Sequence, residues 1–358
     1  MRSHWALPAC ALAFLQPCFV PEKVWLTKDL RKSVKAKHPW LFDRALRGQR
    51  QIAAGSLVSV HWKQQLLAWG FYDPYSPLKV RLLWWPGDPE TPDNGAWAVR
   101  LARAAAERRS GTELAGCSGL RLLHGEADGT PGLVLDAYDA FAVCGFDGRG
   151  AEAFWRPRLA SIVEAFADAG YALQGVLRKN SGETLWGKAA PETVVFAEHG
   201  VRYEVLERHG CSRKAKLRHG HKTGFFLDQR PNRKRLRELA EGKDVLDLFS
   251  YTGGFALAAA MQGAATWAVD QAPKAMEECR RNFALNGLDA KVCRSFDQAS
   301  DAKHALFVED CWDFLRRAAD EKKLFDIAWP PACDGRRDSS AKFNGTKSLL
   351  GTYGDAQL

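Results

Sequence analysis

The N-terminal part of the chain alternates apolar and polar residues with a period of two. The segments 57–62, 66–72 and 79–83 each follow this pattern, and residues typical of turns separate them. Short alternating runs bounded by Gly, Pro and Asp predict the strands of a small β-rich domain. A segment rich in proline and glycine, residues 86–96, is expected to link this domain to the rest of the chain.

The hydrophobic pattern changes after this linker. Up to residue 199 it is mixed, with helices predicted at 97–106 and 152–167 and strands at 120–123, 132–135, 141–145 and 175–178. From residue 200 onward strand-like apolar runs alternate with helical segments, which predicts a doubly wound parallel sheet. The polar segment 293–305 is expected to be a surface loop.

Composition places the chain among ordinary globular proteins. Its 358 residues are 46% hydrophobic and 26% charged, which argues against extended disorder over most of the length. No apolar run reaches the ~18 residues of a membrane-spanning helix, so no membrane association is expected. The nine cysteines include no Cys-x-x-Cys pair, which argues against a disulfide scaffold and against a structural metal site. Reduced thiols of this kind favour a cytoplasmic protein.

Positive charge is concentrated in two segments. Residues 1–85 contain 13 Lys and Arg against 4 Asp and Glu, and residues 201–237 contain 12 against 3. Each segment carries +9, which equals the net charge of the whole chain, so the remainder is acidic. Clustered cations of this kind predict a polyanionic partner, because they displace counterions from phosphates. Two solvated, lysine-rich faces are the alternative.

The first 21 residues contain Arg2 and no acid, and they include a short apolar stretch interrupted by Pro8. This composition is compatible with a targeting segment or with a simple extension. If it is a transit peptide, the location is a mitochondrion or plastid instead of the cytoplasm.

The strongest local signal for chemistry is the segment 244–260, DVLDLFSYTGGFALAAA. An apolar run ends in Gly253-Gly254, which opens an alanine-rich helix whose free N–H groups favour a ligand. Asp270 ends the next apolar run, where a carboxylate can accept both hydroxyls of a ribose. The pattern is not G-x-G-x-x-G, so an adenosine-type ligand without a pyrophosphate, such as S-adenosylmethionine, fits better than a dinucleotide. A βαβ unit without a ligand is the alternative.

Two further features support a cofactor site. Asp310 follows a third apolar run, so an acid again stands at a strand end, where it can accept a hydrogen bond from an adenine amino group. Upstream, the segment HKTGFFLDQR (221–230) packs aromatic, acidic and amide residues closely together. A capped helix start with surface charges is the alternative for this segment.

Taken together, these motifs resemble a family of bacterial-type ribosomal RNA methyltransferases that carry an N-terminal PUA domain and modify cytosine C5 of large-subunit RNA. The resemblance rests on 221–230, on 245–260, on Asp270 and on RRNFALNGL (280–288). It extends to HPWLFDRAL (38–46) and GFYDPYSPLKVRLL (70–83) in the PUA part and to HGEADGTPGLVLD (124–136) in the middle domain.

The resemblance implies an α/β architecture in three parts: a PUA-like RNA-binding domain (22–92), a mixed α/β middle domain (93–199) and a Rossmann-like class I methyltransferase domain (200–331). A divergent tail, 332–358, is expected to be disordered. The implied partner is RNA, with ribosomal RNA favoured, and the target base would leave its stack to be reached. A homodimer is left open.

The resemblance also assigns site residues. The S-adenosylmethionine pocket would have a wall, a floor under the methionine part, a ribose contact and an adenine contact. The wall would consist of Lys222, Thr223, Phe225, Asp228, Gln229 and Arg230. The floor would consist of Asp247, Phe249, Ser250, Tyr251 and Gly253. Asp270 would be the ribose contact and Asp310 the adenine contact. RNA would contact the basic segment of the PUA-like part, through Arg31, Lys32, Lys35, Lys37, His38 and Trp40.

The C-terminal part departs from the family's pattern. The family has Asp-Pro-Pro after a strand beside the transferred methyl group, whereas this chain has Trp329-Pro330-Pro331. Asp326 lies too early to substitute for the acid without a shift in register. The family's last strands and late catalytic cysteine have no counterpart, so the methyltransferase domain is expected to be truncated at its C-terminus.

The missing cysteine matters because cytosine C5 is a poor nucleophile until a thiolate adds to C6. Cys333 is the one nearby candidate, and the catalytic residue is otherwise unknown; Cys279, Cys293 and Cys311 fit small core residues. Two functions therefore stay open. The first is an S-adenosylmethionine-dependent RNA methyltransferase, and the second is an RNA-binding pseudoenzyme of the same family that has lost catalysis.

Overall fold

The computed structural model describes residues 21–47, 51–88, 114–179, 181–206 and 225–329, together with residues 100, 104 and 107. Residues 1–20, most of the predicted helix 97–106 and the predicted tail lie outside this part. The described residues form two compact units: residues up to 104 with 123–134 and 145–170 make the first, and the others make the second. The boundaries proposed at 92/93 and 199/200 remain predictions. Within the described residues, no helix is long and apolar enough to cross a membrane.

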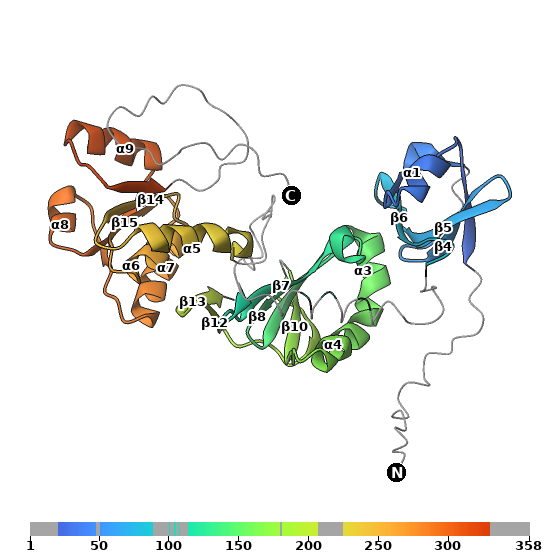
Figure 1. Ribbon diagram of the computed structural model, residues 1–358, viewed down its shortest axis with the longest axis horizontal. Helices are drawn as coiled ribbons and strands as arrows, with labels where there is room; N and C mark the ends of the chain where they lie inside the picture. Colours follow the sequence, from blue (N-terminus) through green and yellow to red (C-terminus); the bar gives the residue numbers. More distant parts are fainter. Residues whose placement is uncertain are drawn as a thin grey trace, which may run out of the picture. The chain divides into compact units, whose positions relative to one another are not determined.

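The first unit contains a six-stranded sheet in the order β2-β6-β5-β4-β1-β3. Figure 1 labels three of its strands, β4, β5 and β6. Its strands are β1 (Glu22–Leu26), β2 (Trp40–Phe42), β3 (Leu46–Arg47), β4 (Leu57–Trp62), β5 (Gln65–Tyr72) and β6 (Leu78–Trp84), and its helices are α1 (Arg31–Lys35) and the 3-10 turn η2 (Asp43–Ala45). Val58 and Val60 are buried in its core, but Ser59 between them is buried as well, so burial along β4 does not alternate strictly. This β-rich arrangement confirms the prediction made from the period-two pattern.

Residues 114–187 contain a five-stranded sheet in the order β11-β10-β9-β8-β7 and several helices. The strands are β7 (Gly119–His124), β8 (Leu133–Tyr138), β9 (Phe141–Phe146), β10 (Gly175–Arg178) and β11 (Thr184–Gly187); the helices are α3 (Arg149–Trp155), α4 (Leu159–Asp168) and the 3-10 turns η4 (Gly125–Asp128) and η5 (Arg156–Arg158). The single helix predicted at 152–167 is wrong. Pro157 lacks the N–H that a continuous helix requires, and the segment divides into α3 and α4 around it.

The C-terminal part contains a parallel sheet in the order β16-β17-β15-β14-β18 (Figure 1). Its strands are β14 (Asp244–Leu248), β15 (Ala265–Asp270), β16 (Lys291–Val292), β17 (His304–Val308) and β18 (Ile327–Trp329). Its helices are α5 (Arg230–Leu239), α6 (Gly254–Ala260), α7 (Pro273–Leu285), α8 (Phe296–Ser300), α9 (Cys311–Asp320) and the 3-10 turn η6 (Leu227–Gln229). The chain runs outward from β14 and returns to its other side at β18, as in doubly wound folds. The predicted α/β class is confirmed.

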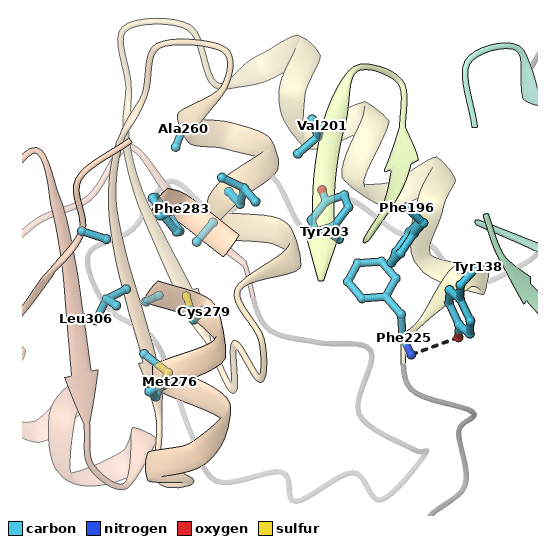
Figure 2. Close-up of a cluster of buried hydrophobic side chains, with 14 of the residues drawn as sticks. Tyr138, Phe196, Val201, Tyr203, Phe225, Ala260, Met276, Cys279, Phe283 and Leu306 are labelled. Atoms are coloured by element: carbon cyan, nitrogen blue, oxygen red, sulfur yellow. Dashed lines mark hydrogen bonds between the residues drawn. The ribbon is translucent and has the colours of Figure 1, made fainter. Parts of the chain in front are cut away.

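A hairpin of β12 (Thr193–Glu198) and β13 (Val201–Leu206) packs against this sheet's helices. Phe196 and Tyr203 of the hairpin stack at 5.5 Å between ring centroids and enclose the ring of Phe225 (Figure 2). The same buried cluster contains Cys279 and Phe283 of α7, so the hairpin and the parallel sheet share one core.

The prediction of a surface loop at 293–305 is wrong for the centre of this segment. Residues Phe296–Ser300 form α8, and Ser295 caps it by accepting a hydrogen bond from the Gln298 N–H. Phe296 and Cys293 are buried with the rings of Trp267 and Phe314, because the segment closes one side of the sheet.

Candidate active site

Three acidic residues stand near the carboxyl ends of neighbouring parallel strands. Asp247 lies in β14, Asp270 ends β15, and Asp310 follows β17. The strand order β17-β15-β14 brings these three strand ends to one edge of the sheet. The order reverses between β14 and β18, which is where doubly wound sheets bind ligands.

The loop 249–253 connects β14 to α6 in an unusual backbone conformation. Phe249, Tyr251 and Gly253 have φ values of 53°, 51° and 75°. A side chain at Gly253 would place its Cβ 2.2 Å from Cys279 Sγ, so only glycine fits there. Two non-glycine residues at positive φ need support from their surroundings, and such strain is concentrated at functional sites.

Asp270 supplies part of this support. Its Oδ2 accepts a hydrogen bond from the Tyr251 N–H at 2.9 Å, and its Oδ1 accepts one from the Ala272 N–H at 2.9 Å. Each carboxylate oxygen retains a second lone pair. Asp270 can therefore hold the loop and still accept ribose hydroxyls.

Asp310 is the N-cap of α9. Its Oδ1 accepts hydrogen bonds from the N–H groups of Trp312 and Asp313 at 2.8 and 3.3 Å. Its Oδ2 takes no hydrogen bond from the described part of the chain. An exocyclic amino group such as that of adenine could donate to this oxygen.

Asp247 is buried and close to a second carboxylate. Its Oδ2 accepts a hydrogen bond from the Ala256 N–H at 3.0 Å. The pKa of this carboxyl is raised to about 8: burial is the main cause, the Ala256 N–H opposes the shift, and the charge of Asp270 adds to it. Asp247 is therefore largely protonated at neutral pH, and a cationic group bound nearby would favour its ionised form.

Exposed apolar side chains accompany these acids. Phe249, Val308 and Trp312 are 36%, 41% and 51% exposed, although side chains of their size are usually more buried. The rings of Phe249 and Trp312 meet edge to face at 6.3 Å. Apolar walls beside hydrogen-bonding carboxylates suit a flat heteroaromatic ring. Sequence reasoning missed Val308 and Trp312, although each lies within two residues of Asp310.

The segment 221–230 is described only from Phe225 onward, so Lys222 and Thr223 lie outside the described residues. Phe225 is a core residue, and its N–H donates to the Tyr138 hydroxyl at 3.2 Å (Figure 2). Its neighbour Phe226, absent from the predicted set, is 38% exposed and meets the Tyr251 ring edge to face at 5.8 Å.

The polar residues of this segment differ in their surroundings. Arg230 lies against β12, where its Nε donates to Glu198 at 3.2 Å and its Nη2 donates to the Gly119 carbonyl. Gln229 accepts a hydrogen bond from Asn232, and Asp228 is exposed. Ser250 is buried, and its hydroxyl donates to Met276 Sδ at 3.4 Å. Direct contacts of these four residues with a cofactor remain predictions.

Trp329 ends β18, which lies on the other side of β14 from the strand that carries Asp270. This residue is the parallel register partner of Asp247, and its ring lies 5.2 Å from that of Phe255. Asp326 lies at the other end of β18, where its Oδ2 accepts a hydrogen bond from the Asp244 N–H at 2.9 Å. It therefore cannot supply an acid at the carboxyl edge in this register.

Burial makes the described cysteines near the site poor nucleophiles. Burial raises the pKa of Cys279 and of Cys293, and it raises that of Cys311 to about 11. A thiol with a raised pKa holds little thiolate at neutral pH. Cys333 lies outside the described residues. Among the residues that are described, no cluster of three potential metal ligands occurs.

The predicted RNA-binding residues lie on α1, in the turn that follows it and at the start of β2, and all six are exposed. Arg31 forms a two-pronged ion pair with Asp29, and Lys37 pairs with Asp88 at 2.8 Å. The Trp40 indole N–H donates to Glu126 at 2.8 Å, and the backbone N–H of Trp40 donates to His38 Nδ1 at 3.3 Å. Lys32 and Lys35 form no ion pair within the described part of the chain, so their charges are the most available to a phosphate.

Further aromatic side chains are exposed in the same unit. Trp40, Phe42 and Tyr75 are 41%, 49% and 66% exposed, and the Arg149 guanidinium lies 4.6 Å above the Tyr75 ring. Trp40 and Phe42 lie on the outward face of the edge strand β2, since Leu41 between them is buried. Exposed rings beside cations are typical of surfaces on which unpaired bases stack.

Comparisons with family models agree with this geometry. The model described as "PUA-like domain" matches residues 24–85, and the model described as "S-adenosylmethionine-dependent methyltransferase" matches residues 173–331. These matches include the β-rich sheet of the first unit and the whole described parallel sheet.

Similar proteins are named as ribosomal RNA methyltransferases. The chain is 37% identical over 281 residues to a "Ribosomal RNA large subunit methyltransferase" of Deinococcus radiodurans, covering 73% of this chain and 65% of that protein. It is 33% identical over 336 residues to a "Ribosomal RNA large subunit methyltransferase I" of Vibrio parahaemolyticus, covering 90% of this chain and 78% of that protein. The chain thus spans less than two thirds of the Deinococcus relative.

Two solved structures are similar over most of the chain. One, from Streptococcus mutans and described as a SAM-dependent methyltransferase, has a TM-score of 0.64 and 26% identity, covering 86% of this chain and 76% of that one. The other, a methyltransferase complexed with S-adenosylhomocysteine, also has a TM-score of 0.64 and 26% identity, covering 87% and 75%.

Proposed function

Because the chain belongs to the family of S-adenosylmethionine-dependent ribosomal RNA large subunit methyltransferases, we propose that it transfers a methyl group from this cofactor to a base of large-subunit ribosomal RNA. The observation that carries the proposal is the placement of Asp247, Asp270 and Asp310 at the carboxyl ends of neighbouring parallel strands, together with the loop 249–253. The relatives are named methyltransferases, so the alternative of a pseudoenzyme is not favoured.

The described residues fit the cofactor. Asp270 and the Oδ2 of Asp310, which takes no hydrogen bond from the described residues, offer acceptors to a ribose and an adenine. Phe249, Val308 and Trp312 offer an apolar wall. Asp247 carries a proton that the positive charge of the methionine part would help to displace. When bound, S-adenosylmethionine supplies an electrophilic methyl group, and the chain's residues hold and orient it.

The RNA side of the proposal rests on the first unit. Lys32 and Lys35 offer charges without an ion-pair partner among the described residues, and Trp40, Phe42 and Tyr75 offer exposed rings. Phosphate contacts supply affinity that depends on salt, whereas ring stacking holds unpaired bases. Both features suit a partly single-stranded RNA segment.

Cytosine C5 is the proposed target atom, and it comes from the motif resemblance. Its chemistry requires a thiolate, and the raised pKa values of Cys279, Cys293 and Cys311 argue against these three. Of the other described cysteines, Cys144 is buried and burial raises the pKa of Cys117. The proposal therefore places the nucleophile among cysteines outside the described residues, with Cys333 as the candidate. The target base would have to leave its stack. A cytoplasmic location belongs to the same proposal, and a homodimer remains a prediction.

Transfer of a labelled methyl group to unmodified large-subunit RNA tests the proposal. The purified chain is incubated in excess with RNA and labelled S-adenosylmethionine, and the product is digested and analysed by mass spectrometry. Label on cytosine C5 supports both parts of the proposal, whereas label on another base supports only the methyltransferase part. Binding of RNA and cofactor without any transfer would favour the pseudoenzyme instead.

A further inference from the structure

The motif RRNFALNGL (280–288) has no role in the site described so far, yet two of its asparagines make unusual contacts. Asn282, in α7, is fully buried. Its Oδ1 accepts a hydrogen bond from the Glu204 N–H of β13 at 2.8 Å, and its Nδ2 donates to the Thr252 carbonyl at 3.0 Å. One side-chain amide thus joins the hairpin to the loop 249–253.

Asn286 contacts the same edge of the hairpin one helical turn later. Its Oδ1 accepts from the Arg202 N–H at 2.9 Å and its Nδ2 donates to the Arg202 carbonyl at 2.7 Å. The two asparagines therefore provide hydrogen-bond partners for backbone groups at the open edge of β13, as a neighbouring strand would. Only Asn282 also reaches the loop.

The loop needs contacts of this kind because its backbone is strained. Phe249 and Tyr251 hold positive φ values, and such residues persist only where the surroundings determine them. The Tyr251 N–H is held by Asp270, and the Phe249 N–H donates to Cys311 Sγ at 3.2 Å. Asn282 is the side chain that holds the carbonyl of Thr252, the residue between Tyr251 and Gly253.

We propose that Asn282 is a positioning residue of the cofactor site: its amide fixes the loop 249–253 against β13 and so sets the affinity for S-adenosylmethionine. The inference rests on the assignment of this loop to the cofactor. A buried amide that loses one partner leaves a donor or acceptor unsatisfied, which is more costly than the loss of an exposed hydrogen bond. Without the hydrogen bond from Asn282 to Thr252, the loop is expected to leave the binding conformation part of the time. The apparent affinity for the cofactor then decreases in proportion to the fraction of molecules whose loop is still in the binding conformation.

The test compares Asn282→Asp with Asn286→Asp in the full chain. Both variants keep the acceptor oxygen that faces the hairpin and lose the amide donor, but only Asn282→Asp loses the bond to Thr252. We expect the Kd for S-adenosylhomocysteine, measured by calorimetry, to rise about tenfold or more in Asn282→Asp and less than about twofold in Asn286→Asp. Hydrogen exchange in the peptide that contains residues 249–260 should accelerate in the first variant alone, while circular dichroism shows both folded.

Three outcomes separate the possibilities. If the unmodified chain does not bind S-adenosylhomocysteine, the cofactor assignment itself fails. If it binds and both variants weaken binding equally, Asn282 acts through hairpin docking and the positioning role is overturned. If it binds and Asn282→Asp binds as tightly as the unmodified chain, the proposal is overturned as well. Should Asn282→Asp fail to fold, Asn282→Leu removes the donor to Thr252 without a buried charge, and Asn286→Leu is its matched control.

Discussion

Arg233 and Glu198 form a buried ion pair that joins α5 to the hairpin strand β12. The Arg233 Nε and Nη2 atoms each lie 2.7 Å from a different oxygen of Glu198, and the two residues are 2% and 3% exposed. The remaining Nη1 donates to the Phe226 carbonyl at 2.9 Å, and the guanidinium lies 4.5 Å from the centre of the Phe225 ring. The pair therefore fixes the segment that carries Phe225 and Phe226.

Arg233→Met should destabilise the fold. Removal of one partner from a buried pair costs about 3–5 kcal/mol, because the other charge stays buried. Arg230 also contacts Glu198, so a loss of about 3 kcal/mol is expected, measured by urea unfolding. The double variant Glu198→Leu/Arg233→Met should lose less than the single variant, since the buried Glu198 charge is removed together with its main partner, while Arg230 keeps its hydrogen bond to the Gly119 carbonyl. Equal losses in the two variants would show that packing, and not charge, dominates.

Asp270→Ala should abolish most of the cofactor affinity. A carboxylate that accepts ribose hydroxyls makes charge-assisted hydrogen bonds of about 1.5–3 kcal/mol each, so loss of the pair should weaken binding roughly 100-fold. Calorimetry with S-adenosylhomocysteine measures the change, and Asp320→Ala, at the exposed end of α9, is the matched control. Retained affinity in Asp270→Ala, or equal stabilisation of the chain by NADH, would contradict the assignment.

The parallel sheet could be predicted because its strands are nearly continuous apolar runs. β15 and β17 are buried along most of their length, and such runs ending in an acid are visible in the sequence alone. The positions of the acids at the strand ends could be predicted from this pattern. The register of β18, which keeps Asp326 away from the carboxyl edge, could be predicted as well.

Other features depend on contacts between distant segments. The burial of Phe296 comes from the rings of Trp267 and Phe314, and the polar residues around it gave no sign of a core position. Phe225 and Phe226 are adjacent in sequence, yet only the hairpin decides that the first is buried and the second exposed. The division of the helix at Pro157, by contrast, had a local signal that the periodicity obscured.

The buried carboxyl of Asp247 should make stability depend on pH. Its pKa is raised from the ordinary 3.8 to about 8 in the folded state, so the folded chain holds this proton more tightly than the unfolded chain. The resulting stabilisation is complete below about pH 4 and is lost as the pH rises to about 8.

Asp247→Asn keeps an oxygen that can accept from the Ala256 N–H but cannot titrate. The free energy of unfolding of this variant, relative to the unmodified chain, is therefore expected to increase between pH 5 and pH 8, by at most about 1.4 kcal/mol per pH unit. Urea unfolding at several pH values measures the difference. A difference that stays constant over this range would show that Asp247 is ionised throughout.

Lys32 and Lys35 should account for part of the salt dependence of RNA binding. Both are exposed on α1 without an ion-pair partner among the described residues, whereas Arg31 beside them is paired with Asp29. Each phosphate contact contributes about 0.7–0.9 to the slope of log K against log salt. Lys32→Ala/Lys35→Ala should therefore flatten the slope by roughly 1.4–1.8, while Arg31→Ala changes it less.

The matched control is Lys291→Ala/Lys303→Ala, which removes the same net charge from exposed positions of the methyltransferase sheet. Filter binding of a large-subunit RNA fragment over a range of salt concentrations gives the slopes. If both double variants flatten the slope equally, the effect is one of overall charge, and the first unit has no special contact with RNA. If only Lys32→Ala/Lys35→Ala does so, α1 faces the phosphates, and the exposed rings of Trp40 and Phe42 on the adjoining β2 become the next residues to replace. Their substitution by alanine should lower affinity by about 1–3 kcal/mol per stacked base and leave the slope unchanged, because stacking releases no counterions.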